Sequence, residues 1–284
     1  MSKKSKHKTK RMDKPNDTLV KRQASYAGDV MHEFHNFPGT YAGPCMNEYP
    51  NVGGGVPRTD STYYVFYNGE KCVMNWEDES TPINMQTLKK IDNYRVNLEY
   101  TFKKPVISGL TTEVPIEKCE RIYKKSPTLT LKPIIRSYPE CEGRQRLISI
   151  KTKIINQEIL SNVEAMDLIM IPKMFTSNHA QVLEEACHLL SQLKIKDFEF
   201  NLELIFEMQC VIHKFAKTIA DIERLEEMIG LKEAVTAMQF QNQKLIDLGA
   251  FEMALKVKNA IGIEKAIEIS GFSREELESE KLNR

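Results

Sequence analysis

The chain has 284 residues, of which 41% are hydrophobic and 28% charged, and its net charge is +1 at neutral pH. These values are typical of a soluble globular protein with one large domain or two smaller ones, and they restrict any binding of a polyanion to local patches. No apolar run approaches the ~20 residues that span a bilayer, and the start lacks the apolar part of a signal peptide, so we expect a cytoplasmic protein. The six cysteines form no CxxC pair, which favours reduced thiols over disulfides or a zinc site.

The first part of the chain contains few regular elements. Residues 1–18 are rich in lysine and poor in apolar side chains, so we expect a disordered basic arm that either contacts phosphates or only adds solubility. Residues 19–35 show a weak helical pattern, and the glycine- and proline-rich residues 36–60 predict a long loop.

A β-hairpin follows in "TYYVFYNGEKCVMNWEDES", residues 62–80. Asn68-Gly69 is the pair that a type I′ turn favours, because both residues tolerate a positive φ. The flanking strands are continuously apolar rather than alternating, which predicts burial on both faces within a sheet that helices cover.

The hairpin register brings acidic residues together. Counting outward from a two-residue turn places Asp60 opposite Glu77, so their side chains share one face, and Glu79 shares that face because it lies two residues further on. Mg²⁺ or Mn²⁺ between these carboxylates would relieve their repulsion, and carboxylates with Mg²⁺ are used for phosphodiester hydrolysis. The alternative is a solvated strand end that protects a sheet edge.

The remaining pattern predicts an α/β fold with a mixed sheet and flanking helices, followed by an α-helical C-terminal region. After the hairpin we expect a helix over 83–102 and strands over 104–114 and 129–137. From about residue 154 the spacing is helical, with helices expected over 182–193, 202–220, 231–248 and 250–260. The chain is therefore divided into residues 1–18, a core of 19–153 and a helical region of 154–284.

Two short helices around Gly271, the second with Ser273 as N-cap and Glu276 three residues on, are also compatible with a helix-turn-helix.

The order of these segments resembles the recombination-promoting nuclease (YhgA-like transposase) family of the PD-(D/E)xK nuclease superfamily, with the archaeal-type members most similar. The motifs are "TDSTYYVFYNGEKCVMNWEDESTP", then "LKKIDNYRVNL", "KPVISGLTTEVPIE" and the closing "IEISGFSREELE". The resemblance implies a PD-(D/E)xK-like core and a metal-dependent DNA endonuclease. In that comparison Asp60 and Glu77 match the two acids, which would bind the metal, and Glu79 completes the catalytic set.

Glu79 is a departure from the pattern, because the family has Gln and the superfamily has Lys at this position. An anionic side chain cannot supply the cation that orients water or phosphate. The carboxylate could instead bind a second metal, or Lys90 or Lys71 could supply the cation, although Lys71 lies at the turn end. The alternative function is a catalytically inactive nuclease fold that serves as a DNA-binding or structural protein.

Four further features bear on partners and ligands. His32 and His35 lie one helical turn apart but lack a third ligand, so we interpret them as surface residues, and Glu33 between them is a further candidate acid. Residues 120–126 form a lysine-rich segment that either contacts a DNA backbone or is simply solvated. The apolar C-terminal helices suggest a homodimer, and no membrane partner is expected.

Overall fold

The computed structural model describes residues 10–45, 59–193, 197–261, 263–270 and 272–279. The chain forms two compact units, residues 1–231 and 232–284. This division lies well after the predicted change near residue 154, because the helices of residues 140–228 pack with the helices that cover the sheet in the first unit.

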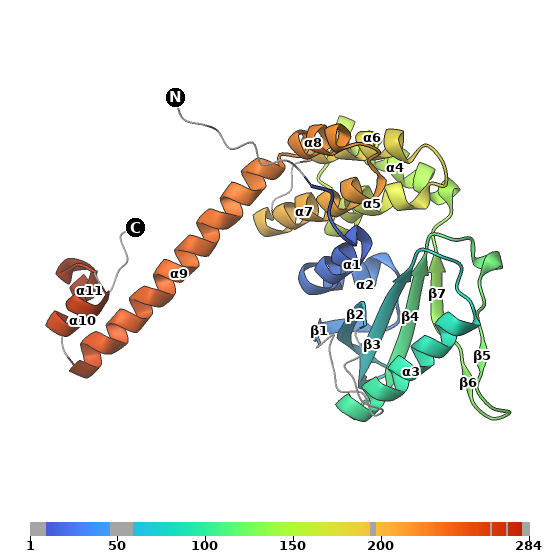
Figure 1. Ribbon diagram of the computed structural model, residues 1–284, viewed down its shortest axis with the longest axis horizontal. Coiled ribbons are helices and arrows are strands. Elements are labelled where there is room, and N and C mark those ends of the chain that lie inside the picture. The colour runs from blue at the N-terminus through green and yellow to red at the C-terminus, as the bar shows by residue number, and fades with distance from the viewer. Residues whose placement is uncertain (1–9, 46–58, 194–196, 262, 271, 280–284) are drawn as a thin grey trace. The chain divides into compact units, whose positions relative to one another are not determined.

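The first unit is built on a five-stranded mixed sheet with the order β1-β2-β3-β4-β7 (Figure 1). Its strands are β1 (Thr40–Pro44), β2 (Ser61–Tyr67), β3 (Glu70–Glu79), β4 (Val106–Thr112) and β7 (Ile134–Ser137). The first three strands pair antiparallel, and β3, β4 and β7 run parallel. The predicted α/β class with a mixed sheet, flanking helices and a helical C-terminal region is confirmed.

Helices cover both faces of this sheet. On one face α3 (Met85–Phe102) packs against β3 and β4, while on the other α1 (Pro15–Tyr26) and α2 (Gly28–Phe34) contact β2 and β1 (Figure 1). The other helices of the unit are α4 (Glu140–Ile155), α5 (Asn162–Met174), α6 (His179–Gln192), α7 (Phe198–Phe215) and α8 (Ile219–Met228). A short 3₁₀ turn (Ile116–Lys118) precedes a small two-stranded ribbon of β5 (Tyr123–Lys124) and β6 (Thr130–Leu131).

The predicted hairpin turn is confirmed. Asn68 and Gly69 have φ values of 50° and 80°, and Tyr67 pairs with Glu70 directly beyond them. The predicted burial holds for most of the apolar run, where Tyr63, Val65, Val73 and Trp76 are at most 1% exposed. It is wrong next to the turn, where Phe66 is 53% and Tyr67 39% exposed. The turn therefore sets the register of the central strand pair.

Several predicted boundaries are wrong. The expected disorder of residues 1–18 does not extend over the described part, since α1 begins at Pro15 and the Met12 amide donates to His213 Nδ1 at 2.8 Å. The single helix expected over 19–35 is interrupted at Ala27, and the predicted loop contains β1. Residues 1–9 and 46–58 of these predictions lie outside the described residues.

Two other predicted elements differ in continuity. The strand expected over 129–137 divides at Pro133, which has no amide hydrogen for a sheet ladder, into β6 and β7. The two helices expected over 231–260 form one helix, α9 (Leu231–Ile261), which passes through Gly249.

The second unit contains most of α9 together with α10 (Ile263–Ser270) and α11 (Arg274–Ser279). Its core consists of Phe251, Ala254, Ala266, Phe272 and Leu277. The predicted capping box is present, because the Ser273 amide donates to Glu276 and the Glu276 amide donates to Ser273 Oγ. In the described part of the chain, no helix is both long and apolar enough to cross a membrane.

Candidate active site at the end of the central hairpin

The open end of the hairpin brings Asp60 and Glu77 together, as the register predicts. The β2–β3 ladder ends with Ser61 opposite Trp76, one residue short of this pair. The Asp60 amide donates to Glu77 Oε1 at 3.0 Å, and the Asp60 carboxylate accepts a bond from the Asp78 amide at 3.1 Å. The carboxylates of Asp60 and Glu77 thus each accept a hydrogen bond from a backbone amide of the opposite segment of the hairpin.

The environment of Glu77 disfavours its ionised form. The residue is 1% exposed, and burial together with the charge of Asp60 raises its pKa to about 8, against the opposing effect of Lys90. Burial likewise raises the pKa of Asp60. A buried carboxylate beside a second acid tends to hold a proton unless a cation replaces it.

That cation is supplied by α3. Lys90 Nζ lies 3.1 Å from Glu77 Oε2 and 3.2 Å from Glu79 Oε1. Burial opposes the charge of Lys90, but the two carboxylates outweigh it and raise the pKa of the lysine. Of the two lysines named above, Lys90 is therefore the one that contacts these acids, whereas Lys71 lies with its Nζ 4.1 Å from the centre of the Tyr64 ring near the turn.

Tyr94 is a member of this cluster that sequence reasoning did not single out. It lies one turn after Lys90 on α3, and the lysine Nζ is 5.6 Å from the centre of its ring. Burial and the charge of Glu77 raise the pKa of the Tyr94 phenol, and Asp60 and Glu79 add to that shift. The spacing of four residues between Lys90 and Tyr94, which places both on one helix face, is the signal that could have found it.

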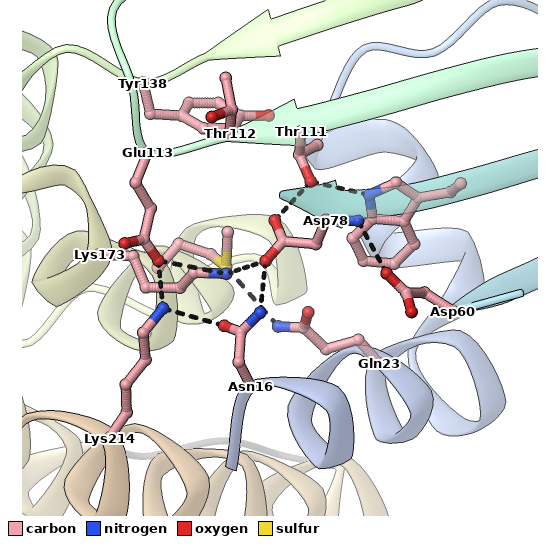
Figure 2. A network of polar contacts seen from close by, with 12 residues as sticks. Asn16, Gln23, Asp60, Asp78, Thr111, Thr112, Glu113, Tyr138, Lys173 and Lys214 are labelled. Atoms are coloured by element: carbon pink, nitrogen blue, oxygen red, sulfur yellow. Dashed lines mark hydrogen bonds and ion pairs between the residues drawn. The ribbon is translucent and has the colours of Figure 1, made fainter. Parts of the chain in front are cut away.

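The next residue, Asp78, has its side chain on the opposite face of the strand from Glu77, because side chains alternate along a strand. It enters a network of polar contacts, which the bond from its amide to Asp60 joins to the acidic pair (Figure 2). Its carboxylate accepts hydrogen bonds from Thr111 at 2.6 Å, Asn16 at 2.8 Å and Lys173 at 2.9 Å. Burial alone would raise the pKa of Asp78, but Lys173 and these hydrogen bonds hold it well below its usual value. Asp78 is therefore a buried carboxylate that stays ionised, in contrast to Glu77.

This network joins segments that are distant in the chain. Lys214 of α7 donates to Asn16 at 3.0 Å and forms an ion pair with Glu113, which follows β4 (Figure 2). The cavity beside Asp78 and Lys173 has a volume of about 10 Å³, which is room for one water molecule. The network therefore fixes the helices onto the sheet and is too closely packed to hold a substrate.

The metal ligands predicted at the hairpin end are only partly brought together. In the described residues, no group of three or more His, Cys, Asp or Glu side chains is arranged to hold a metal, so the expected cluster of three carboxylates does not form. Lys90 contacts both Glu77 and Glu79 instead, with its Nζ 3.1 and 3.2 Å from one oxygen of each. Asp60 and Glu77 remain, and Mg²⁺ is commonly bound through one or two carboxylates plus waters and substrate phosphate.

The interpretation of the two histidines as surface residues is wrong. His32 is 5% exposed and lies 3.2 Å from the Tyr63 hydroxyl, and His35 is 1% exposed beside Tyr138 and the Trp76 ring. Burial lowers the pKa of His35 to about 3, so it stays neutral. Glu33, between them, is exposed on α2. The histidines thus belong to the core between α2 and the sheet.

Comparisons with models of protein families, with curated proteins and with solved structures find no match to this chain.

Proposed function

We propose that this protein is a metal-dependent DNA endonuclease that hydrolyses phosphodiester bonds at the Asp60–Glu77–Lys90 site. The observation that carries the proposal is the position of Lys90, which reaches from α3 to both Glu77 and Glu79 and whose charge also acts on Asp60. A lysine at this place supplies the positive charge that position 79 would lack on the sequence pattern alone. Acid pairs beside a lysine suit the hydrolysis of a phosphodiester.

Each side chain has a role in this proposal. Asp60 and Glu77 would hold Mg²⁺ or Mn²⁺, which, when bound, activates water and neutralises charge on the phosphate. Glu77 would exchange Lys90 for the metal, and Glu79 would keep the lysine at 3.2 Å, directed at the scissile phosphate. Lys90, held in place by Glu79, would then take the role of the lysine in the superfamily pattern.

A plasmid-nicking assay with Mg²⁺ or Mn²⁺ tests this function. We expect Glu77→Ala and Asp60→Ala to abolish metal-dependent nicking, and Lys90→Ala to slow it by about 10²–10³-fold, the typical effect of losing one charge-stabilising group. Matched controls are Glu70→Ala at the turn and Lys89→Ala on α3, both exposed and outside the site. A wild-type protein without metal-dependent nicking would contradict the proposal, as would equal rates for Lys90→Ala and Lys89→Ala.

A second candidate is a non-catalytic DNA-binding or structural protein on the same scaffold. It is favoured by the same lysine, because Lys90 already contacts both Glu77 and Glu79 without a metal. Calorimetric titration with Mn²⁺ separates the two candidates. A catalytic site should bind Mn²⁺ in the wild type and lose it in Asp60→Ala, whereas an ion-paired strand end should show no binding in either.

Other predicted partners remain predictions. Cutting both strands of a duplex would require two sites, for which a homodimer through the C-terminal helices is one arrangement. DNA binding by the α10–α11 hairpin and by the basic N-terminal residues belongs to the same proposal, and residues 1–9 lie outside the described part.

A further inference from the structure

The β5–β6 ribbon is a basic surface that the proposed site does not use. Residues 116–132 contain five basic side chains and two acidic ones. One of the five, Lys125, is paired with Asp92, and the described part of the chain gives no carboxylate partner to the other four. These four, called the ribbon cations below, are Lys118, Arg121, Lys124 and Lys132, and all are exposed.

The strand register divides the ribbon into an inner and an outer face. Tyr123 pairs with Leu131, and both pack against the core of Ile83, Leu88, Ile91 and Leu110 beneath α3. Lys124 pairs with Thr130, and both are exposed. Lys132 is the next residue after β6, and the alternation of side chains along a strand, continued by one residue, places it on the outer face with Lys124. Diagonal neighbours of this kind lie about 7–8 Å apart.

The ribbon is held firmly beside the helix that carries Lys90 (Figure 1). Lys125 Nζ donates to the buried Asp92 carboxylate of α3 at 2.8 Å, and Arg95 binds the same carboxylate at 2.9 Å. The Glu120 amide donates to the carbonyl of Ile83 at 2.8 Å, in the segment between Glu79 and α3. The outer face is thus fixed relative to the acidic site.

We infer that the outer face of the β5–β6 ribbon binds the phosphate backbone of duplex DNA. Duplex DNA carries one negative charge per ~1.7 Å of its axis, so exposed cations on a fixed surface neutralise phosphates regardless of sequence. A single-stranded substrate would instead favour exposed aromatic rings for stacking on bases. Tyr123, the one aromatic residue in 116–132, packs inward. This inference rests on the proposed function, which it extends from the bond that is cut to the way in which the substrate is held.

The salt dependence of binding tests this inference independently of cleavage. Anisotropy of a fluorescent DNA duplex, measured in EDTA at several KCl concentrations, reports binding without metal-dependent chemistry. We expect Lys124→Gln/Lys132→Gln to bind at least several-fold more weakly, with a slope of log K against log[salt] that is shallower by about 2, roughly one per lost phosphate contact. Lys124→Arg/Lys132→Arg should keep the wild-type slope.

The control is Lys217→Gln/Lys232→Gln, which removes the same charge from two exposed lysines elsewhere. Equal slopes for the ribbon variant and wild type would overturn the inference, and so would an equal loss in this control. A ribbon variant that weakens binding of single-stranded DNA as much as that of the duplex would overturn the duplex assignment. If the ribbon variant binds DNA more weakly as expected but the wild type never nicks DNA, DNA binding by the ribbon is upheld and the proposed endonuclease function is rejected.

Discussion

Two adjacent residues of β3, Glu77 and Asp78, show how the environment determines the charge of a carboxylate. Both are buried, yet the pKa of Glu77 is raised to about 8 and that of Asp78 is lowered. The difference follows from their neighbours. Glu77 faces Asp60 and one half-exposed lysine, whereas Asp78 receives hydrogen bonds from three donors, one of them the buried Lys173.

The raised pKa of Glu77 predicts a specific pH dependence of stability. The folded protein holds the proton up to about pH 8, whereas an unfolded glutamate releases it near 4.5, so stability is lost as the pH rises through this window. We expect the free energy of unfolding in EDTA to fall between pH 5 and 8 in the wild type more than in Glu77→Gln, measured by urea denaturation. Mn²⁺ should restore the loss at pH 8 in the wild type only. Parallel pH profiles for the two proteins would contradict this prediction.

At the level of elements, the sequence predicted the site only as far as local rules reach. The Asn68-Gly69 turn determined the register, and the register placed Asp60 beside Glu77. The contribution of α3 depends on how that helix is rotated over the sheet. The helical pattern does not specify this rotation closely enough to direct Lys90 to the acids. The contact of Asp78 with Lys173, 95 residues later, follows no local periodicity.

The Asp78–Lys173 ion pair connects α5 to the sheet and should matter more for stability than for chemistry. Each side chain is 4% exposed. Lys173→Met leaves a buried carboxylate without its cation, so we expect a loss of about 3–5 kcal/mol in the free energy of unfolding. Asp78→Asn/Lys173→Met should recover most of that loss, because no unpaired charge remains. Chemical denaturation measures both, and a double variant no more stable than Lys173→Met would contradict the account.

At the level of the whole molecule, the chain consists of two units that each have their own core. The predicted boundary near residue 154 was based on a change in secondary structure from strands to helices, but this change comes earlier, since β7 ends at Ser137 and α4 begins at Glu140. A compact unit is determined by packing. The helices α5 and α7 pack against α2 and α1, which contact the sheet, and α4, α6 and α8 pack on α5 and α7, so all belong to the first unit. Hydrophobic periodicity indicates where the type of secondary structure changes, but it carries little information on where one compact unit ends and the next begins.

The separate core of the second unit predicts local rather than global destabilisation. Phe272 is 5% exposed, and its ring centre lies 5.2 Å from that of Phe251. Phe272→Ala removes a buried aromatic ring at a cost of about 3–5 kcal/mol. We expect faster amide hydrogen exchange in residues 251–279 and unchanged protection of β2, β3 and α3, as measured by mass spectrometry. Met253→Ala, at an exposed position of the same helix, is the control, and a loss of protection in the sheet would contradict the prediction.

The alternation of β3 also constrains how this chain can diverge. Glu77 and Asp78 are neighbours that serve opposite sides of the sheet, so one residue added or removed between the turn and Glu77 would exchange their surroundings. Lys173 of α5 would then no longer lie beside Asp78, and the contact between Asp60 and Glu77 at the hairpin end would be lost. Related chains should therefore tolerate changes of residue type along this strand far more readily than a change in its length.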